Sequence, residues 1–350
     1  MKTKAAILYQ LKQPLVVAND VEVPALRKGQ VLVKVLYTGI CRAQYNEMIG
    51  LKGPDRFLPH LLGHEASGIV VKIGRGVTKV KKGDYVALSW IKGSGIEAGG
   101  SSYRRGNEII NAGGVTTFSE YTVASENRVN KIPRKIPPDV AAIIGCAIVT
   151  GAGIVNNTLK AKKGSSIAIF GVGGVGTSVL LAAKARGCKP IIAVDVVPQK
   201  LDFAKRLGAT HTVSADGDVV AKVRAIIKDG TDFAVDASGS KSAMEAAFDC
   251  IRVGGTFVIA GNLGKDEKIS IHPFELIKGK KIVGTWGGET VPQEDIPRYA
   301  RQYLQGRLPI NRLITHCFRL DDINQAFDVL LQGEAGRVIL KVSDDKPAKK

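Results

Sequence analysis

The sequence predicts an α/β protein in which a small all-β unit is followed by a doubly wound parallel sheet. Up to about residue 145 the chain carries short apolar runs separated by Gly and Pro, whereas after Lys163 apolar strands alternate with helical stretches. The first pattern is typical of a small barrel or sandwich and the second of a parallel sheet. A chain of 350 residues that is 45% apolar is long enough for two domains with substantial cores.

The first part of the chain contains several runs that fit β-strands. The clearest are QVLVKVLYTGI at 30–40, ASGIVVKIG at 66–74, DYVALSW at 84–90 and FSEYTV at 118–123. They are rich in Val, Ile, Tyr and Thr, which favour a pleated sheet. These runs predict an all-β domain, either a barrel or a sandwich.

The second part opens with the strand SSIAIF, the glycine-rich GVGGVG and a helical stretch that ends at Arg186. The further strands are PIIAVD, HTVSA, DFAVDAS and TFVIAG, and the helical stretches between them are PQKLDFAKRLG, DVVAKVRAIIK and KSAMEAAFDCIR. This alternation predicts the doubly wound sheet. From about residue 290 two helical stretches and the strand RVILKV remain, too little for a domain, so we expect this segment to pack back on the first one.

The charge is strongly positive, with 50 Lys and Arg against 32 Asp and Glu, a formal net charge of +18. Such an excess can serve nucleic-acid binding, an anionic substrate or cofactor, or a solvated surface. The basic residues are spread along the chain apart from small groups such as the tail KPAKK, and no RNA-binding signature is present. We therefore expect a basic surface that attracts anions and no nucleic-acid partner.

The cysteines and the N-terminus indicate a compartment. Five scattered cysteines are too few for a disulfide framework in a chain of this length. The start MKTKAAILYQ leads into no apolar leader with a cleavage site, and no apolar run is long enough to span a membrane. We expect a reduced, cytoplasmic protein that does not bind membranes.

The motif GVGGVG at 171–176 predicts a dinucleotide site because it follows an apolar strand and opens a helix. Gly171 permits the tight turn, Gly173 lets backbone amides approach a pyrophosphate, and Gly176 lets the helix pack closely on the strand. Gly174 and Val175 complete the turn. The alternative is a glycine-rich turn that binds no nucleotide.

The second strand of this unit ends at Asp195, 19 residues beyond Gly176. A carboxylate there can accept hydrogen bonds from both ribose hydroxyls and repel a 2′-phosphate, which predicts NAD rather than NADP. Lys200 either touches the adenosine ribose or lies on a solvated helix face.

Cys41, His64 and Cys146 are candidate ligands of a metal ion. Catalytic zinc takes three protein ligands, of which Cys₂His is one set, and leaves a position for substrate or water. The three residues are far apart in the sequence, so no short zinc-finger spacing joins them, and each is otherwise explained as a core residue or a hydrogen-bonded histidine.

Three segments resemble the medium-chain, zinc-dependent alcohol dehydrogenases. LLGHEASGIVVKIGRGVTKVKKGDYVAL resembles the GHE-x-x-G segment and the G-D-x-V that follows it, TGICRAQ the segment of the first zinc cysteine, and IIGCAIVTGAG that of the second. GVGGVG, Asp195 and the closing GRVILKV also occur in family order, so the resemblance covers essentially the whole chain.

The resemblance implies roles for residues at the metal. Cys41, His64 and Cys146 match the catalytic zinc ligands, and Glu65 matches a carboxylate that lies behind the metal and ligates it transiently.

For the cofactor, the resemblance implies that Arg42 and Arg337 hold the NAD pyrophosphate and that Thr150 lies near the nicotinamide. It also implies a GroES-like catalytic domain at 1–147, a Rossmann-type NAD-binding domain at 148–289 and a returning segment at 290–350, with the cofactor in the cleft between the domains. The family is usually dimeric or tetrameric, so we expect a homodimer or a homotetramer.

The segment 89–114 departs from the family pattern. Many members bind a second, structural zinc through four closely spaced cysteines, and this segment has none. We therefore expect one catalytic zinc per chain and no structural zinc. The composition, rich in Gly, Ser and Asn, suggests a loop that is held by hydrogen bonds or by a neighbouring subunit, that shapes the substrate entrance, or that is merely solvated.

Ala43 and Gln44 are the second departure. The family usually has Ser or Thr two residues after the zinc Cys, where the hydroxyl passes the substrate proton towards solvent, and Ala43 has no such group. The family usually has Asp at the next position, bonded to the His ligand, and Gln44 can make that bond without a charge. We expect proton transfer through an ordered water or a substrate hydroxyl, and a zinc that is more electrophilic but more weakly bound.

The function expected from these observations is a zinc-dependent oxidoreductase that transfers a hydride between NAD(H) and an alcohol or carbonyl substrate. The absent relay hydroxyl suggests a polyol, sugar or cyclitol derivative. One alternative is an enone or quinone reductase of the zinc-free type, which the three candidate ligands argue against. The other is a non-catalytic protein that binds NAD and RNA.

Overall fold

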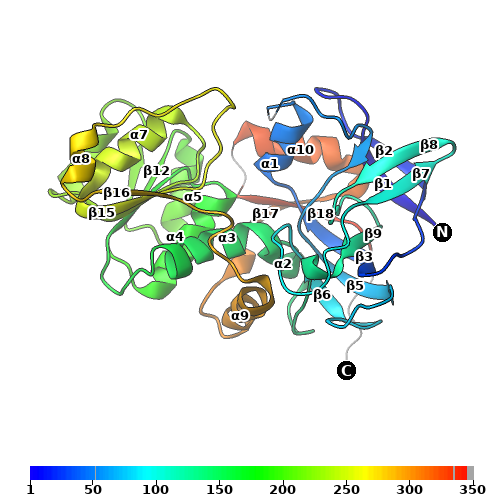
Figure 1. Cartoon of the computed structure of the whole chain (residues 1–350). Coiled ribbons are helices and arrows are strands. Elements are labelled where there is room, and N and C mark those ends of the chain that lie inside the picture. Colours follow the sequence, from blue (N-terminus) through cyan, green and yellow to red (C-terminus); the bar gives the residue numbers. More distant parts are fainter. Residues whose placement is uncertain (52, 334–335, 345–350) are drawn as a thin grey trace.

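The chain forms two lobes, a β-rich one and an α/β one, that meet along a central helical stretch (Figure 1). The computed structural model describes residues 1–51, 53–333 and 336–344, so the basic tail KPAKK lies outside the described residues. The strands of the β-rich lobe are β1 (Lys2–Leu8), β2 (Val16–Glu22), β3 (Gln30–Gly39), β4 (His60–Leu61), β5 (Ala66–Ile73), β6 (Tyr85–Leu88), β7 (Ser101–Arg105), β8 (Glu108–Ala112), β9 (Tyr121–Ser125) and β10 (Val129–Lys131).

Strands β1, β2, β7, β8 and β4 close into a small barrel. Its interior holds Ile7, Val21, Tyr103 and Ile110, all fully buried. Alternate residues of each strand point inward, which is the period of two that a half-buried strand requires. A barrel was one of the two all-β arrangements that the sequence left open.

A second sheet of the β-rich lobe has the order β10-β6-β5-β3-β18-β17, with β9 also paired to β3. β17 (Ile314–Arg319) and β18 (Arg337–Lys341) come from the C-terminal end of the chain, and Leu340 of β18 pairs with Thr38 of β3. Because β3 pairs with β5, β9 and β18, it is buried along most of its length, and its end is held firmly where Cys41 follows.

The α/β lobe contains a parallel sheet in the order β13-β12-β11-β14-β15-β16. Its strands are β11 (Ile167–Phe170), β12 (Ile191–Asp195), β13 (His211–Ser214), β14 (Thr231–Asp236), β15 (Ile251–Ile259) and β16 (Lys281–Gly284). The strand order reverses between β11 and β14, and ligands of such sheets bind outside the carboxyl ends of the strands at this point. These features confirm the predicted α/β fold.

The sheet separates two hydrophobic cores. Ile167 and Ile169 of β11 face one core, and Ala168 and Phe170 face the other. Helices cover both faces, as a parallel sheet requires. They are α4 (Gly174–Arg186), α5 (Pro198–Leu207), α6 (Val219–Ile226) and α7 (Lys241–Cys250), whereas the short α8 (Pro273–Ile277) buries none of its residues.

A nearly continuous helical stretch runs between the lobes. It consists of α2 (Pro138–Ala142), the π-helical turn η2 (Ile144–Ile148), α3 (Val149–Gly153) and a second π-helical turn, η3 (Ile154–Thr158). The remaining helices are α1 (Arg42–Met48), α9 (Pro292–Leu304) and α10 (Ile323–Gln332), with short 3₁₀ turns at 126–128, 310–313 and 320–322. Among the described helices, none has both the length and the apolar content needed to cross a membrane.

The segment 89–114 is only partly a loop, so that expectation is wrong for its second half. Residues 101–112 form the antiparallel pair β7–β8, which completes the barrel. The first half is held by hydrogen bonds, because Glu126 accepts from the backbone N–H of Ile96 at 2.8 Å and Ser125 Oγ accepts from that of Ala98 at 3.1 Å.

Candidate functional site

Cys41 lies at the end of β3, where the chain turns into α1. Its backbone N–H donates to Oε1 of Gln44 at 2.9 Å, so the side chain of Gln44 reaches back over the first turn of the helix. A residue before a helix with extended backbone and a partner three residues on is a common way to start a helix. This local structure fixes where the Cys41 thiol points.

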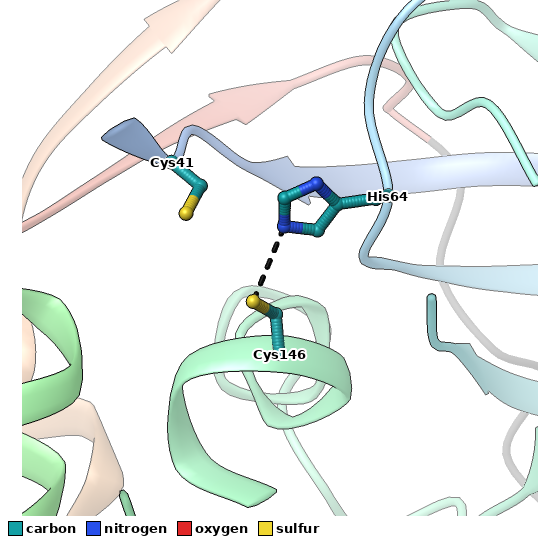
Figure 2. A group of neighbouring side chains, drawn as sticks. All are labelled: Cys41, His64 and Cys146. Atoms are coloured by element: carbon teal, nitrogen blue, oxygen red, sulfur yellow. Dashed lines mark hydrogen bonds between the residues drawn. The ribbon is translucent and has the colours of Figure 1, made fainter. Parts of the chain in front are cut away.

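The side chains of Cys41, His64 and Cys146 converge between the lobes, as Figure 2 shows. His64 lies on the connection between β4 and β5, and Cys146 lies on η2. The Sγ atoms and a ring nitrogen lie within 4.8 Å of one another, and His64 Nε2 is 3.2 Å from Cys146 Sγ. The fold therefore brings together three donors that the sequence holds far apart.

The charges of this thiol–imidazole cluster depend on its own contacts. The hydrogen bond with Cys146 lowers the pKa of Cys41 well below its ordinary value, and the same contact raises the pKa of Cys146. Burial lowers the pKa of His64, but the contact with Cys41 outweighs it and the pKa is raised. A cluster that favours a thiolate already has the charge and the soft donors that suit zinc.

Glu65 lies next to His64 but belongs to a different pair. Its Oε1 forms a fully buried ion pair with the Arg337 guanidinium, and Oε2 has no hydrogen-bond partner among the described residues. A side chain on Gly39 would collide with both members of this pair. Burial raises the pKa of Glu65, and Arg337 offsets part of that effect.

The glycine-rich turn has the shape that a pyrophosphate needs. Gly171 has φ +83°, which favours glycine, and a Cβ on Gly176 would collide with the carbonyl of Gly171. A Cβ on Gly173 would meet nothing within 4 Å, so open space lies in front of the N-terminus of α4. A helix N-terminus with open space before it attracts anions.

Other residues surround this turn. Arg337 approaches Gly174 so closely that a Cβ there would touch its guanidinium, so this arginine lies between Glu65 and the start of α4. Val175 packs against the core of the α/β lobe. Arg42 is exposed and stacks on Tyr45, 5.5 Å from the ring centre.

Asp195 ends β12 beside the same turn. Its carboxylate accepts hydrogen bonds from the backbone N–H of Val172 at 2.8 Å and of Val197 at 3.0 Å. Lys200 is half-buried on α5, and Thr150 is buried on α3, which follows η2 in the chain. The structure thus places Arg337 beside both Glu65 and the glycine-rich turn, and Asp195 beside the same turn. In contrast, no side-chain hydrogen bond or ion pair among the described residues joins Arg42, Thr150 or Lys200 to the turn or to the cluster.

The comparisons with known proteins agree with this geometry. Residues 174–305 match the zinc-binding dehydrogenase family, and residues 27–134 match the alcohol dehydrogenase GroES-like domain. An S-(hydroxymethyl)glutathione dehydrogenase of Synechocystis sp. is 33% identical, and the match covers 97% of this chain and 100% of that protein. The chain belongs to the zinc-dependent medium-chain alcohol dehydrogenase family.

Solved structures of this alcohol dehydrogenase family superpose over almost the whole chain. Benzyl alcohol dehydrogenase of Acinetobacter calcoaceticus has a TM-score of 0.89 at 30% identity, and the match covers 98% of this chain and 100% of that one. 2R,3R-butanediol dehydrogenase of Bacillus subtilis has a TM-score of 0.80 at 26% identity, with coverage of 97% and 100%. The chain is therefore an oxidoreductase that acts on an alcohol or carbonyl group, rather than a non-catalytic NAD-binding protein.

The position of Gln44 differs from the expectation for this dehydrogenase. Its oxygen accepts from Cys41, and among the described residues no hydrogen bond joins it to His64. The Nε2 of Gln44 has no hydrogen-bond partner either, although the residue is buried. The amide therefore orients the start of α1 rather than the imidazole.

A cavity of about 240 Å³ adjoins Ala43 in the cleft of the dehydrogenase. Ala43 and Asn46 line it from α1, and Asn262 and Lys265 line it from the segment after β15. Asn262 and Lys265 were not predicted from the sequence as site residues. The only signal was their place after the predicted strand TFVIAG, since ligands bind beyond the carboxyl ends of such strands.

Two tryptophans were also missed. Trp90 follows β6 and Trp286 follows β16, and their rings meet edge to face with 5.1 Å between centroids. They are the only two tryptophans in the sequence, which was the available signal. The pair joins the two lobes of the dehydrogenase beside the cleft.

A second group of possible ligands includes none of Cys41, His64 and Cys146. Carboxylate oxygens of Glu47 and Asp55 and a ring nitrogen of His60 lie within 4.8 Å of one another. His60 Nε2 is 2.8 Å from Asp55, and its Nδ1 is 3.0 Å from the carbonyl of Leu61. A hydrogen-bonded histidine–aspartate pair accounts for these contacts.

Proposed function

We propose that this dehydrogenase oxidises an alcohol with NAD⁺ at a single catalytic zinc held by Cys41, His64 and Cys146. The observation that carries the proposal is the convergence of two thiols and an imidazole within 4.8 Å at the cleft between the lobes. Three such ligands form a known catalytic set that leaves one position for the substrate oxygen. In the reaction, a CH–OH group loses a hydride to NAD⁺ and a proton to solvent and becomes C=O.

When bound, the metal supplies a Lewis acid that favours the deprotonated form of the substrate hydroxyl. The protein supplies the charge and the position for this chemistry. The contact with Cys146 lowers the pKa of the Cys41 thiol, which favours the thiolate form that a metal ligand needs. The buried ion pair with Arg337 holds the Glu65 carboxylate beside the cluster, and we propose that this carboxylate would ligate the metal only when the pair opens.

The nucleotide site orients the cofactor through the α/β lobe. We propose that the backbone of Gly171, Gly173, Gly174, Val175 and Gly176 and the side chains of Arg42 and Arg337 hold the pyrophosphate. The open space before α4 supports this assignment.

Selectivity for NAD is assigned to Asp195, whose buried carboxylate disfavours a 2′-phosphate. Lys200 extends this ribose site. Thr150, buried on α3 four residues after Cys146, is assigned to the nicotinamide end because it matches the family residue at that place.

Ala43 offers no hydroxyl to move the proton, so we propose that a water in the adjoining cavity does so. The cavity of about 240 Å³ has room for several waters and includes the polar side chains of Asn46 and Lys265. A hydroxyl of a polyhydroxylated substrate can take the same place. The structurally similar 2R,3R-butanediol dehydrogenase of Bacillus subtilis is named for a diol, which supports such a substrate.

The assembly is proposed to be a homodimer or a homotetramer. β16 is the edge strand of its sheet, and the neighbouring Phe274 and Ile277 are exposed apolar side chains on α8. Exposed edges and apolar patches of this kind are typical of subunit contacts. All five cysteines are free thiols, which supports a reducing compartment such as the cytoplasm.

The experiment that tests this function is alcohol-dependent reduction of NAD by the purified protein before and after chelation. We expect activity with NAD, little with NADP, loss of activity after chelation and recovery when zinc is restored. Activity that survives complete removal of the metal would contradict the proposal and favour the zinc-free reductase alternative.

A further inference from the structure

A second and larger cavity lies within the β-rich lobe. Its volume is about 720 Å³, within the range of pockets that hold small ligands. Every described residue that lines it lies between Pro24 and Thr116, so the α/β lobe contributes none. His64 is one of the lining residues, and the cavity therefore extends to a member of the thiol–imidazole cluster.

Three buried polar side chains in this lining, those of Gln44, Ser101 and Thr116, lack hydrogen-bond partners among the described residues. The Nε2 of Gln44 and the Oγ1 of Thr116 form no hydrogen bond with any described residue. Gln44 is 2% exposed and Thr116 is 4% exposed. Buried polar groups are nearly always hydrogen-bonded, so three unpartnered groups on one cavity indicate that a polar ligand completes their hydrogen bonds.

The rest of the lining suits a hydroxylated ligand. Glu47 and His60 add polar side chains, and Arg27 adds a positive charge. An amide donor, hydroxyls and a carboxylate together suit a ligand whose groups both donate and accept, which is the property of hydroxyls.

The apolar side chains point to the same class of ligand. Phe57 lines the cavity and is 56% exposed, so an aromatic face is available to the C–H groups of a ligand. Leu61 and Ala112 supply further apolar surface. A cavity that combines such faces with hydroxyl and amide groups fits a polyol or sugar better than a hydrocarbon.

We propose that this cavity binds the hydroxylated part of the substrate that lies away from the reacting carbon, and that the substrate is a polyol or sugar. The inference rests on the proposed function, because His64 connects the cavity to the site of oxidation. It adds to that function a subsite and the residues that select the substrate. Gln44 and Thr116 are specificity residues in this account and take no part in hydride transfer.

The test compares Thr116→Val with wild type, because valine has the shape of threonine without its hydroxyl. The substrates are glycerol, erythritol, xylitol, sorbitol and myo-inositol, with 1-hexanol and cyclohexanol as matched monohydric probes. We expect KM for the best polyol to rise about tenfold, as for loss of one hydrogen bond, with kcat changed less than about twofold. KM for cyclohexanol should not change.

Thr122→Val is the matched control. Thr122 is a buried threonine on β9 of the same lobe and does not line the cavity. This variant should leave KM unchanged for polyols and monohydric alcohols alike, so a general effect of losing a buried hydroxyl is separated from an effect on the cavity.

Calorimetric titration of the same polyols distinguishes failure of the cavity proposal from failure of the proposed function, because it measures binding without catalysis. If wild type binds a polyol, Thr116→Val weakens that binding and wild type oxidises no alcohol, the cavity proposal is supported and the proposed function is refuted. Equal polyol KM and affinity in Thr116→Val and wild type, or a wild type that prefers cyclohexanol to every polyol, would overturn the inference.

Discussion

Ala43 is the residue at which we propose that proton transfer in this dehydrogenase departs from the family pattern. A methyl group there neither donates nor accepts a hydrogen bond, and Ala43 lines a cavity of about 240 Å³ that has room for water. The side chain that relays protons elsewhere in the family is therefore replaced, in our account, by solvent. We therefore expect position 43 to accept a different side chain without loss of activity.

Ala43→Thr should keep alcohol-dependent NAD reduction within about threefold of wild type, because the path through water does not use the side chain. The pH–rate profile and the solvent isotope effect of the two proteins check this. Ala43→Val is the matched control, since it adds the volume of threonine without the hydroxyl. If both variants are inactive, the site requires the space; if only Ala43→Thr changes the isotope effect, the added hydroxyl joins the path.

At this scale the sequence predicted most of the site through family resemblance rather than through spacing. Cys41, His64 and Cys146 stand on three separate segments, and only the fold brings their donor atoms within 4.8 Å of one another. The hydrogen-bond partner of the Gln44 side chain was not predictable. Whether this side chain bonds to His64 or to the backbone of Cys41 depends on the backbone conformation at the start of α1. The unpartnered Thr116 carries no motif at all.

The glycine-rich turn between β11 and α4 is the element whose role was clearest from the sequence. Three of its glycines have separate duties: Gly171 adopts a positive φ, Gly176 packs on the strand, and Gly173 faces open space. Substitution by alanine should therefore affect NAD binding at Gly173 and stability at Gly176.

Gly173→Ala should fold with unchanged thermal stability and bind NAD at least about tenfold more weakly, because its Cβ occupies the space of the pyrophosphate. Gly176→Ala should instead lower the free energy of unfolding by about 1–3 kcal/mol, because its Cβ collides with the carbonyl of Gly171. Thermal denaturation and NAD titration of both variants check the pair. Unchanged NAD affinity in Gly173→Ala would contradict the assignment of the pyrophosphate.

The segment 89–114 shows why some elements were not predictable. β7 reads SSYRR and β8 reads EIINA, and neither has the apolar alternation of a typical strand. Their pairing closes the barrel, and Tyr103 and Ile110 supply the side chains that are buried inside it. Short polar strands of this kind depend on tertiary contacts that sequence periodicity does not contain.

For the whole molecule, the expected organisation into a β-rich part and an α/β part followed from the change of pattern along the sequence. The pairing of β18 with β3 could be anticipated only in outline, because the returning strand has no local signal for its partner. At the edge of the α/β sheet, β16 and the exposed apolar side chains of α8 are covered by no other element among the described residues.

Ile277→Lys should dissociate the proposed oligomer into monomers, because it places a charge on a side chain that is 78% exposed beside the sheet edge. Size-exclusion chromatography with light scattering measures the mass. Ile109→Lys is the control, since Ile109 is an exposed apolar residue on β8, far along the chain from this edge. A wild type that is monomeric at micromolar concentration would refute the interface.

The zinc content of the purified wild-type chain tests the central claim most directly. Cys41, His64 and Cys146 form one catalytic set, and the segment 89–114 contains no cysteine for a structural ion. Elemental analysis by mass spectrometry should therefore give one zinc per chain. Zero would contradict the assignment of the cluster as the catalytic centre, and two would contradict the single site and direct attention to Glu47, Asp55 and His60.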